Sequence, residues 1–423
     1  MNNSALHKRA YLAAILIGLL PAWMILLPLD ITSDPEGWQV FIRAKSLAVP
    51  LAQLMFVLLA MSITFSPIGS ISQLPRITKT AILLWLIVAA IVSFQSGKDH
   101  LSAFIGLFKI IIAGLFLLAL VNLRLTFGLR FLTVLWTALG VGTIVYSVLW
   151  TIHIFIVSPQ GVEWMVRVPG VNNVRHTGHF TIASVTAGLF TFLAFRSNPK
   201  ILFRWMIPSM FAIIGLGLAL WTGSRGPLLA SLITMGVTCC MAVRKRRVVA
   251  IFCLSSVLVA TAVVALMPVP NKQIYGIAGA TGWEDVSAQG AHDSSSGRTL
   301  LWTDTARQIR ERPLFGWGVE QFGMSSRSSL GQFLHPHNFP LQLMFSGGLS
   351  SVLLLFLIVF PVVRRSGWPS IKGPNAAGVA CVIGMSIYSL YDGALYFSYP
   401  IMIFLIAVTT SIPQTLKKAG HSG

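Results

Sequence analysis

Long apolar runs separated by short polar connections make up most of the chain. A helix that crosses a bilayer needs about 20 apolar residues, and the sequence reaches that length repeatedly. We therefore expect an all-α polytopic membrane protein with about twelve transmembrane helices. The expected helices are 10–29, 46–65, 78–95, 102–121, 131–156, 177–195, 205–222, 226–243, 249–267, 341–363, 375–391 and 397–412.

One polar stretch, residues 268–336, is far longer than any other connection. Its part 276–296 is rich in Gly, Ala and Ser, which predicts a mobile segment. From Arg298 to Arg310 apolar residues recur at helical spacing, and Pro313 follows. This pattern predicts an amphipathic helix that ends before the proline. We expect it to lie on the outer membrane surface and to cover a site formed by the other loops.

The long stretch divides the chain into three parts. Residues 1–267 hold the first nine expected helices, residues 268–336 form the large loop, and residues 337–423 hold the last three helices and a short tail. A smaller outer loop is expected at 30–45.

The distribution of charge predicts the orientation. Charged residues make up only 10% of the chain, against about 25% in soluble domains. With twelve spans, the side that holds both termini carries eighteen Lys and Arg and no acidic residue, whereas all 12 Asp and Glu lie on the other side. The positive-inside rule therefore puts both termini in the cytoplasm and the large loop in the periplasm. The net charge of +19 is a topology signal and does not indicate nucleic-acid binding.

Three expected helices begin at the outer face beside cationic or hydrogen-bonding residues. Helix N-termini carry free N–H groups and partial positive charge, which favour anions. These starts therefore predict a site for an anionic substrate. The residues concerned are Arg175, His176 and His179 at the first start, Ser224 and Arg225 at the second, and His337 and Asn338 at the third.

Arg225 lies in a turn of about three residues between two expected spans, so it lies near the outer interface. A guanidinium there can hold a phosphate through two parallel hydrogen bonds. The alternative is an arginine that reaches lipid headgroups. Because Arg175 and Arg298 are expected on the same side, we favour phosphate binding by all three.

Two histidines, His335 and His337, end the large loop. A neutral histidine at the membrane edge can take a proton from an attacking hydroxyl near pH 7. The alternative is a polar cap with no chemical role. Seven of the nine histidines lie on or near the outer side, which favours a chemical role. Spacing alone does not choose between His335 and His337, and His337 is our candidate.

Lys109 is the one basic residue well inside an expected span, since Lys79 lies at the very start of its span. Its side chain either reaches the interface or lines a polar cavity, and charged residues within a membrane are frequently functional. Asp34 and Glu36 in the first outer loop form an acidic pair. A solvated turn is the favoured interpretation of that pair, with metal binding left open.

The loop and its neighbours carry recognisable motifs. The segment Arg298…Trp302…Pro313-Leu314-Phe315-Gly316-Trp317-Gly318, followed by His337-Asn338-Phe339-Pro340, resembles the signature of the O-antigen ligase and polymerase superfamily. The turn Thr222-Gly223-Ser224-Arg225-Gly226-Pro227 resembles that family's other arginine motif.

The resemblance implies a glycosyltransferase at the periplasmic face of the bacterial inner membrane, which takes a glycan from undecaprenyl diphosphate. His337 then corresponds to the essential histidine of the large loop, and Arg225 and Arg298 to the arginines that hold the diphosphate. Arg175 is added from topology and charge. One dominant loop late in the chain and a short basic tail favour the ligase branch, whose acceptor is the lipid A-core oligosaccharide. Because arginines can replace a divalent cation at a diphosphate, we expect no metal and no cofactor.

Two other functions remain open. A glycan polymerase of the same superfamily differs from a ligase in its acceptor. A transporter or flippase for a lipid-linked anion would also use many helices and a cationic pocket. Transporters place their polar groups near the middle of the membrane, whereas here these groups are expected on one face, which favours an enzyme.

Overall fold

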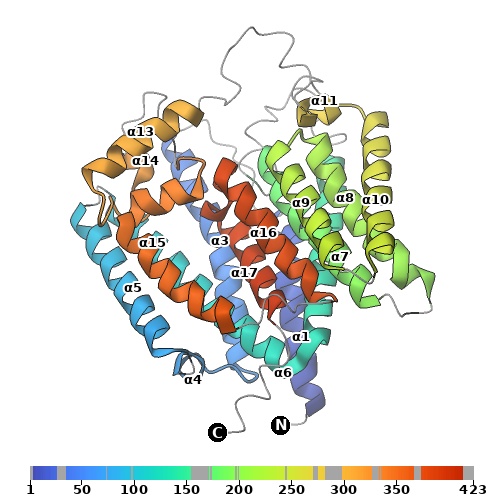
Figure 1. Ribbon diagram of the computed structural model, residues 1–423, viewed down its shortest axis with the longest axis horizontal. Helices are drawn as coiled ribbons and strands as arrows, with labels where there is room; N and C mark the ends of the chain where they lie inside the picture. Colours follow the sequence, from blue (N-terminus) through green and yellow to red (C-terminus); the bar gives the residue numbers. More distant parts are fainter. Residues whose placement is uncertain are drawn as a thin grey trace.

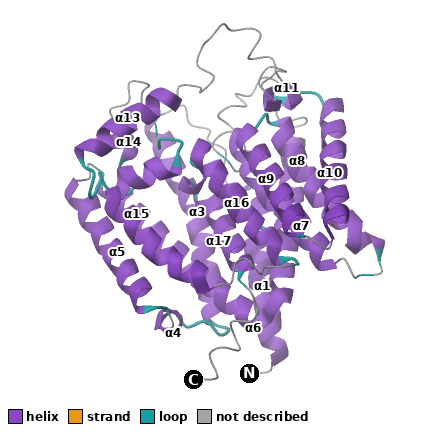
Figure 2. Ribbon diagram, viewed as in Figure 1, coloured by secondary structure: helices purple, strands orange, loops and turns teal. Residues whose placement is uncertain are grey.

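The computed structural model describes the chain as helices. It covers residues 3–25, 35–72, 74–96, 99–153, 174–195, 200–242, 245–269, 275–281, 298–325, 335–365 and 373–412, together with the single residues 171, 198 and 333. Throughout these residues the elements are helical and none is a β-strand (Figure 2). The predicted all-α fold is confirmed.

A helix or half-helix covers each of the twelve predicted spans. Six of the described helices are long and apolar enough to cross a membrane by themselves, so the full count of crossing helices stays a prediction. The long elements are α1 (Asn3–Gly18) with α2 (Leu20–Met24), α3 (Pro35–Met61), α5 (Arg76–Ser96), α6 (His100–Ile152), α7 (Gly178–Phe195), α8 (Ile207–Trp221), α9 (Arg225–Met241), α10 (Arg246–Leu266), α15 (Phe339–Arg365), α16 (Asn375–Asp392) and α17 (Ser398–Ser411).

Short helices lie at the two ends of this bundle. The start of α1 and the helix α4 lie at one end, whereas α11 and α13 lie at the other (Figure 1). The sides of the membrane on which the termini and the large loop lie stay a prediction. The short elements are α4 (Pro67–Ser72), η2 (Val174–Thr177), η3 (Leu202–Met206), α11 (Gly276–Thr281), α13 (Arg298–Glu311), α14 (Phe322–Ser325) and η6 (Ala394–Tyr396).

The helix α7 forms the centre of the main core. Every residue from Gly178 to Leu193 is buried, because α6, α8, α9 and α16 all pack around it. A helix that is apolar on all sides is expected in such a position. Its N-terminus, which begins the predicted site, is therefore held by the best-packed part of the molecule.

The helix α6 corrects one predicted connection. The predicted spans 102–121 and 131–156 belong to one element with a kink at Gly128, where φ is +70° and ψ is −153°. The connection expected between the two spans is therefore helical on both sides of one glycine. Arg124, one of the eighteen basic residues counted on the side of the termini, is only 2% exposed, and its Nη2 atom donates to Asn375 Oδ1 at 3.4 Å.

Two other predicted loops contain helix. The helix α3 begins at Pro35, within the loop expected at 30–45, and α11 occupies residues 276–281 of the segment expected to be mobile. Hydropathy detects only the apolar part of a helix, so it missed helical residues outside the apolar runs. In α3 the helix begins at Pro35, and Pro favours the first turn of a helix. The rest of the segment 276–296 lies outside the described residues.

The predicted amphipathic helix of the loop is confirmed as α13. Leu301, Thr305, Gln308 and Ile309 form its buried side. This face packs on α15, and Leu301 and Ile309 join Trp317, Phe322 and Phe345 in a second apolar cluster. The loop thus has a small core of its own, built against one transmembrane helix.

The middle of the large loop is hydrogen-bonded to α15 at the point where that helix is broken. At Gly348 the backbone has φ +61° and ψ −159°, so neighbouring peptide groups lose their helical partners. Loop residues replace them: Trp317 N–H donates to Phe345 O at 2.7 Å, and Leu349 N–H donates to Pro313 O at 2.8 Å. Buried backbone groups need such partners. We call residues 313–321 the wedge.

The wedge also binds the neighbouring helices. The backbone N–H of Val319 donates to Ser93 Oγ of α5 at 2.8 Å. The side-chain amide of Gln321 exchanges two hydrogen bonds with the backbone of Asp99, the residue that caps α6. Three membrane helices are therefore joined through one loop segment.

Replacing Gly348 tests this joint. Gly348→Ala would place a Cβ 2.4 Å from the carbonyl carbon of Leu314, in a backbone region that only glycine adopts readily. We expect it to destabilise the protein by about 1–3 kcal/mol, measured as a lower thermal unfolding midpoint in detergent.

Gly217→Ala is the matched control, because nothing lies within 4 Å of the added Cβ at that helical position. Alanine is the better helix former, so this variant should unfold at or slightly above the wild-type midpoint. Equal midpoints for the two variants would show that the joint contributes nothing.

Candidate functional site

The predicted site residues come together at the loop-bearing end of the bundle. The starts of α7, α9 and α15 meet the end of α16 and the short helix η6 there, and the start of α13 reaches the same place.

His337 lies two residues before the start of α15 and faces an acidic residue. Its Nδ1 atom lies 3.4 Å from Asp392 Oδ1, and its side chain is 28% exposed. Its backbone has φ +52°, a conformation that residues other than glycine rarely adopt outside constrained sites. The surrounding contacts therefore hold His337 in a specific orientation.

Asp392 ends α16, just after the predicted span 375–391, and its carboxylate makes two contacts besides the one with His337. The hydroxyl of Tyr388 donates to its Oδ2 at 2.8 Å. The Nη2 atom of Arg298 lies 3.6 Å from its Oδ1, the same oxygen that faces His337. A base, a cation and a phenol thus share one carboxylate.

The electrostatic surroundings keep Asp392 charged. Burial alone would raise the pKa of this carboxyl, but the hydrogen bond with His337 and the charge of Arg298 outweigh it, and the pKa lies well below its ordinary value. A permanent carboxylate favours the His337 tautomer that carries its proton on Nδ1. The other ring nitrogen, Nε2, is then the atom that can accept a proton.

His335 has a different environment. It is 5% exposed, its ring stacks on Tyr396 with centroids 4.5 Å apart, and its Nδ1 atom accepts the backbone N–H of His337 at 3.2 Å. Burial, and next the neighbouring His337, lower the pKa of His335 well below its usual value. A neutral ring that accepts at Nδ1 serves to hold the backbone of His337.

Gly393 allows α16 to end against this pair. Its φ is +60°, and an added Cβ would lie 3.1 Å from His335 Nδ1 and 3.2 Å from the Cα of His337. A larger residue at this position would be strained by its conformation and would crowd the two histidines.

Asn338 fixes the start of α15. Its Oδ1 atom accepts the N–H of Leu341 at 2.9 Å, as an N-cap does. Its Nδ2 atom donates to Leu390 O at 2.8 Å, two residues before Asp392. Asn338 therefore ties the residue after His337 to the end of α16.

The starts of α7 and α9 form the other side of the site. Gly178 packs against Ser224 and Pro227. The rings of His176 and His179 stack with centroids 5.2 Å apart. Ser224 is buried and its hydroxyl lies 2.8 Å from that of Thr222, so it supports the turn.

Two aromatic residues join this side to the histidines of the loop. The ring of Phe397 lies 4.6 Å from that of His176 and 5.0 Å from that of His335. The ring of Tyr388 packs against Gly226, the residue after Arg225. The turn at residues 222–227, which holds Arg225 and is called the arginine turn below, therefore contacts the same tyrosine as the Asp392 carboxylate does.

Arg225 is exposed at the start of α9. Its Nε atom donates to Gly279 O of α11 at 3.0 Å. This contact ties the arginine turn to the beginning of the large loop.

Lys109 pairs with a loop residue that the sequence did not indicate. Its Nζ atom lies 3.1 Å from Glu320 Oε1 in the wedge, about 13 Å along α6 from His100. The other carboxylate oxygen accepts the hydroxyl of Tyr396 at 2.7 Å, and Tyr396 stacks on His335. Lys109 thus reaches the site through Glu320 and Tyr396.

Three predicted candidates fall wholly or partly outside the described residues. The backbone of Arg175 lies in η2, but its side chain is not described. Asp34 is not described, and neither is the side chain of Glu36. Among the residues that are described, no group of three or more His, Cys, Asp and Glu could hold a metal ion.

The sequence analysis missed Asp392, Tyr388, Glu320 and Tyr396. One signal was present: Asp392 is the only acidic residue after Glu320, and it directly follows a predicted span. The two tyrosines carry no comparable signal, because aromatic residues are common at the ends of membrane helices.

The arrangement can hold an anionic substrate beside a general base. An exposed histidine oriented by a carboxylate can remove a proton from a hydroxyl, and nearby arginines can stabilise a charged leaving group. The described residues supply both parts on one face of the bundle.

Comparison with known proteins agrees with this chemistry. A family model described as O-antigen ligase matches residues 210–357, a segment that includes Arg225, Arg298 and His337 and ends in the first part of α15. No curated protein matches the chain. Residues 210–357 therefore carry the similarity to O-antigen ligases, which supports membership of that superfamily.

Proposed function

We propose that the protein transfers O-antigen polysaccharide from undecaprenyl diphosphate to the lipid A-core oligosaccharide, at the periplasmic face of the bacterial inner membrane. The observation that carries this proposal is the contact of His337 and Arg298 with one oxygen of Asp392. A base and a phosphate-binding cation at adjacent positions suit a reaction in which a hydroxyl attacks a carbon that bears a diphosphate.

In the proposed reaction His337 acts as the general base. Asp392 orients the ring through Nδ1, and Nε2 takes the proton of the acceptor hydroxyl. The oxygen of that hydroxyl forms a bond to the anomeric carbon of the glycan as the bond from that carbon to the diphosphate oxygen breaks. Direct attack inverts the configuration at the anomeric carbon. The undecaprenyl diphosphate leaves as an anion.

The arginines hold that anion. Arg298 exchanges its contact with Asp392 for the diphosphate when the donor binds, and Arg225 and Arg175 complete the group. The N-termini of α7 and α9 add their partial positive charge. Charge stabilisation in a pre-formed site is frequently the largest part of catalysis, so this step requires no metal and no cofactor.

The environments of the two loop histidines support His337 as the base. The ring of His335 is buried and its Nδ1 atom is engaged by a backbone N–H, whereas His337 is partly exposed. His335 is a positioning residue in this proposal. Lys109 acts further away, through Glu320 and Tyr396.

Substitution of the two histidines tests the assignment. His337→Gln should reduce kcat by roughly 10²–10⁴, the usual contribution of a positioned base. His335→Gln should have a clearly smaller effect, because it removes a support and leaves the base. The assay contains purified protein, lipid-linked glycan, lipid A-core and EDTA.

Near-normal ligation by His337→Gln would contradict the assignment of the base. Longer lipid-linked glycans formed without lipid A-core would identify a polymerase. Loss of all activity in EDTA, restored by Mg²⁺, would instead favour a metal-dependent reaction with Asp34 and Glu36 as metal ligands.

Substitution of Arg298 tests the binding of the leaving group. Arg298→Gln should reduce kcat at least as much as His337→Gln does, by about 10²–10³. Arg307→Gln is the control on the same helix, because that side chain is 70% exposed and pairs with Asp304 at 3.5 Å, within α13 itself. It should retain wild-type kcat. Equal losses in the two variants would refute the role of Arg298.

A further inference from the structure

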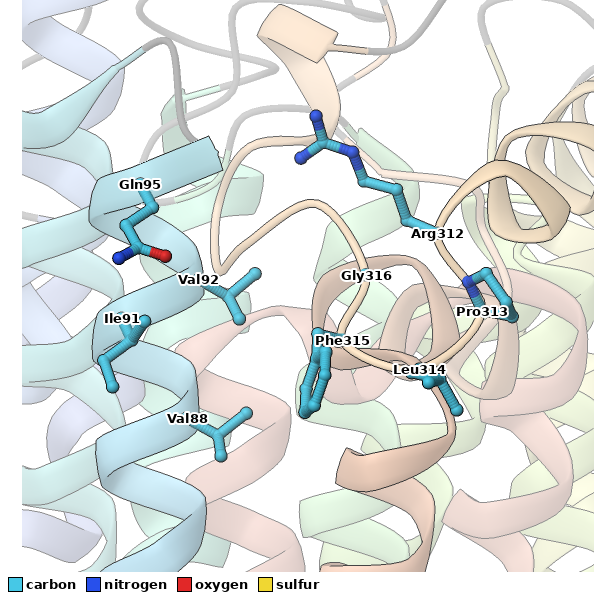
Figure 3. Close-up of a pocket in the computed structure, with 9 residues that line it drawn as sticks. All are labelled: Val88, Ile91, Val92, Gln95, Arg312, Pro313, Leu314, Phe315 and Gly316. Atoms are coloured by element: carbon cyan, nitrogen blue, oxygen red, sulfur yellow. The ribbon is translucent and has the colours of Figure 1, made fainter.

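A groove lies between α5 and the wedge (Figure 3). It lies beyond the C-terminal end of α13, whereas Arg298 at the start of that helix contacts Asp392. Its volume is about 660 Å³. Val88, Ile91 and Val92 of α5 form one wall, and Leu314 and Phe315 of the wedge form the other. The lower part of the groove is therefore apolar on both sides.

The two polar side chains of the groove lie at one end. Gln95, in the last turn of α5, and Arg312 lie above the apolar walls (Figure 3). The guanidinium of Arg312 lies 4.2 Å from the ring centroid of Trp317, which holds the cation at the rim. The groove thus has an apolar body and a cationic rim.

The walls are open to the surroundings of the bundle. Leu314 is 59% exposed and Phe315 is 52% exposed, although both are large apolar residues. Exposed apolar side chains of this kind suit contact with lipid chains. The stretch of α5 from Val88 to Gln95 is about 10 Å long. An amphiphile in the groove would therefore lie with its chains along α5 and its anionic head at Arg312.

We propose that this groove holds the phosphorylated lipid anchor of the acceptor. This inference rests on the proposed function, in which both substrates are lipid-linked. Arg312 binds a phosphate of the lipid headgroup, and the apolar walls contact an acyl chain. The charge of the rim complements the phosphate, and the shape of the groove complements the chain.

The distance along α13 decides between the two lipids. This helix has 14 residues from Arg298 to Glu311, which corresponds to about 20 Å. In the donor, the carbon that reacts is bonded directly to the diphosphate, so the donor phosphates must lie beside His337 and Arg298. In the acceptor, core sugars separate the reacting hydroxyl from the lipid phosphate. Only the acceptor can place a lipid phosphate at Arg312 and its reacting group at His337.

The groove and the site are also joined mechanically. The wedge forms one wall of the groove and makes backbone hydrogen bonds to α15 at its break, and α15 begins two residues after His337. The separation between the two lipid positions is thus fixed by packed elements, which lets α13 set the distance between the acceptor anchor and the base.

Kinetics of two acceptors test the proposal. Arg312→Gln should raise the KM for lipid A-core about tenfold, because a charge-assisted contact is lost. The KM for the lipid-linked donor and the kcat should stay within about twofold. With a water-soluble core oligosaccharide that lacks lipid A, wild type and Arg312→Gln should react equally. Val88→Trp, which fills the apolar part, should repeat this pattern.

Arg310→Gln is the matched control, since Arg310 is an exposed arginine of the last turn of α13 and does not line the groove. It should leave all three constants unchanged. An equal rise in the acceptor KM for Arg310→Gln would overturn the proposal, and so would a rise in the donor KM for Arg312→Gln.

A binding measurement keeps this test separate from the test of the proposed function. Wild type in nanodiscs, analysed by native mass spectrometry, should retain bisphosphorylated lipid A more strongly than dephosphorylated lipid A, and Arg312→Gln should lose the difference. Retention without any transfer would refute the proposed function alone. Equal retention by wild type and Arg312→Gln would refute the groove as the acceptor site.

Discussion

Three side chains from different parts of the chain converge on the carboxylate of Asp392. His337 comes from the segment before α15, Arg298 from the start of α13, and Tyr388 from α16 itself. The Asp392 side chain is 29% exposed, and removing even part of a carboxylate from water is costly unless it is paired and hydrogen-bonded. This requirement makes the histidine, the cation and the phenol depend on one another, because each helps to satisfy the same charge. The contact of Arg298 with Asp392 also ties the start of α13 to the end of α16.

The wedge also pairs backbone groups of α15 that would otherwise lack hydrogen-bond partners. The break of α15 at Gly348 leaves peptide groups without helical partners, and the loop supplies them through Trp317 and Pro313. The same segment carries Glu320 towards Lys109 and Tyr396. Backbone pairing inside a membrane protein is strict because lipid offers no alternative partner. The loop is therefore part of the helical framework. It supports the candidate base His337 through Arg298, which contacts Asp392, and through Glu320, which binds Tyr396 beside His335.

The sequence predicted the helices and the face on which the site lies, because apolar runs and charge asymmetry report those features directly. It also predicted α13 and the starts of α7, α9 and α15 from spacing and capping residues. It could not predict Asp392 or Glu320, because their partners are distant in sequence and only packing brings them together. It erred at Arg124 and at residue 35, where a helix continued through polar positions that hydropathy treats as loop.

The most direct test of the shared carboxylate is a double-mutant cycle on the rate of ligation. The variants are Asp392→Asn, His337→Gln and the double substitution, each compared in kcat with wild type. If Asp392 acts through His337, the double variant should be no slower than His337→Gln alone, because residues that act as a unit are not additive. A double variant whose loss equals the product of the two single losses would show that Asp392 and His337 act independently, and would contradict the account.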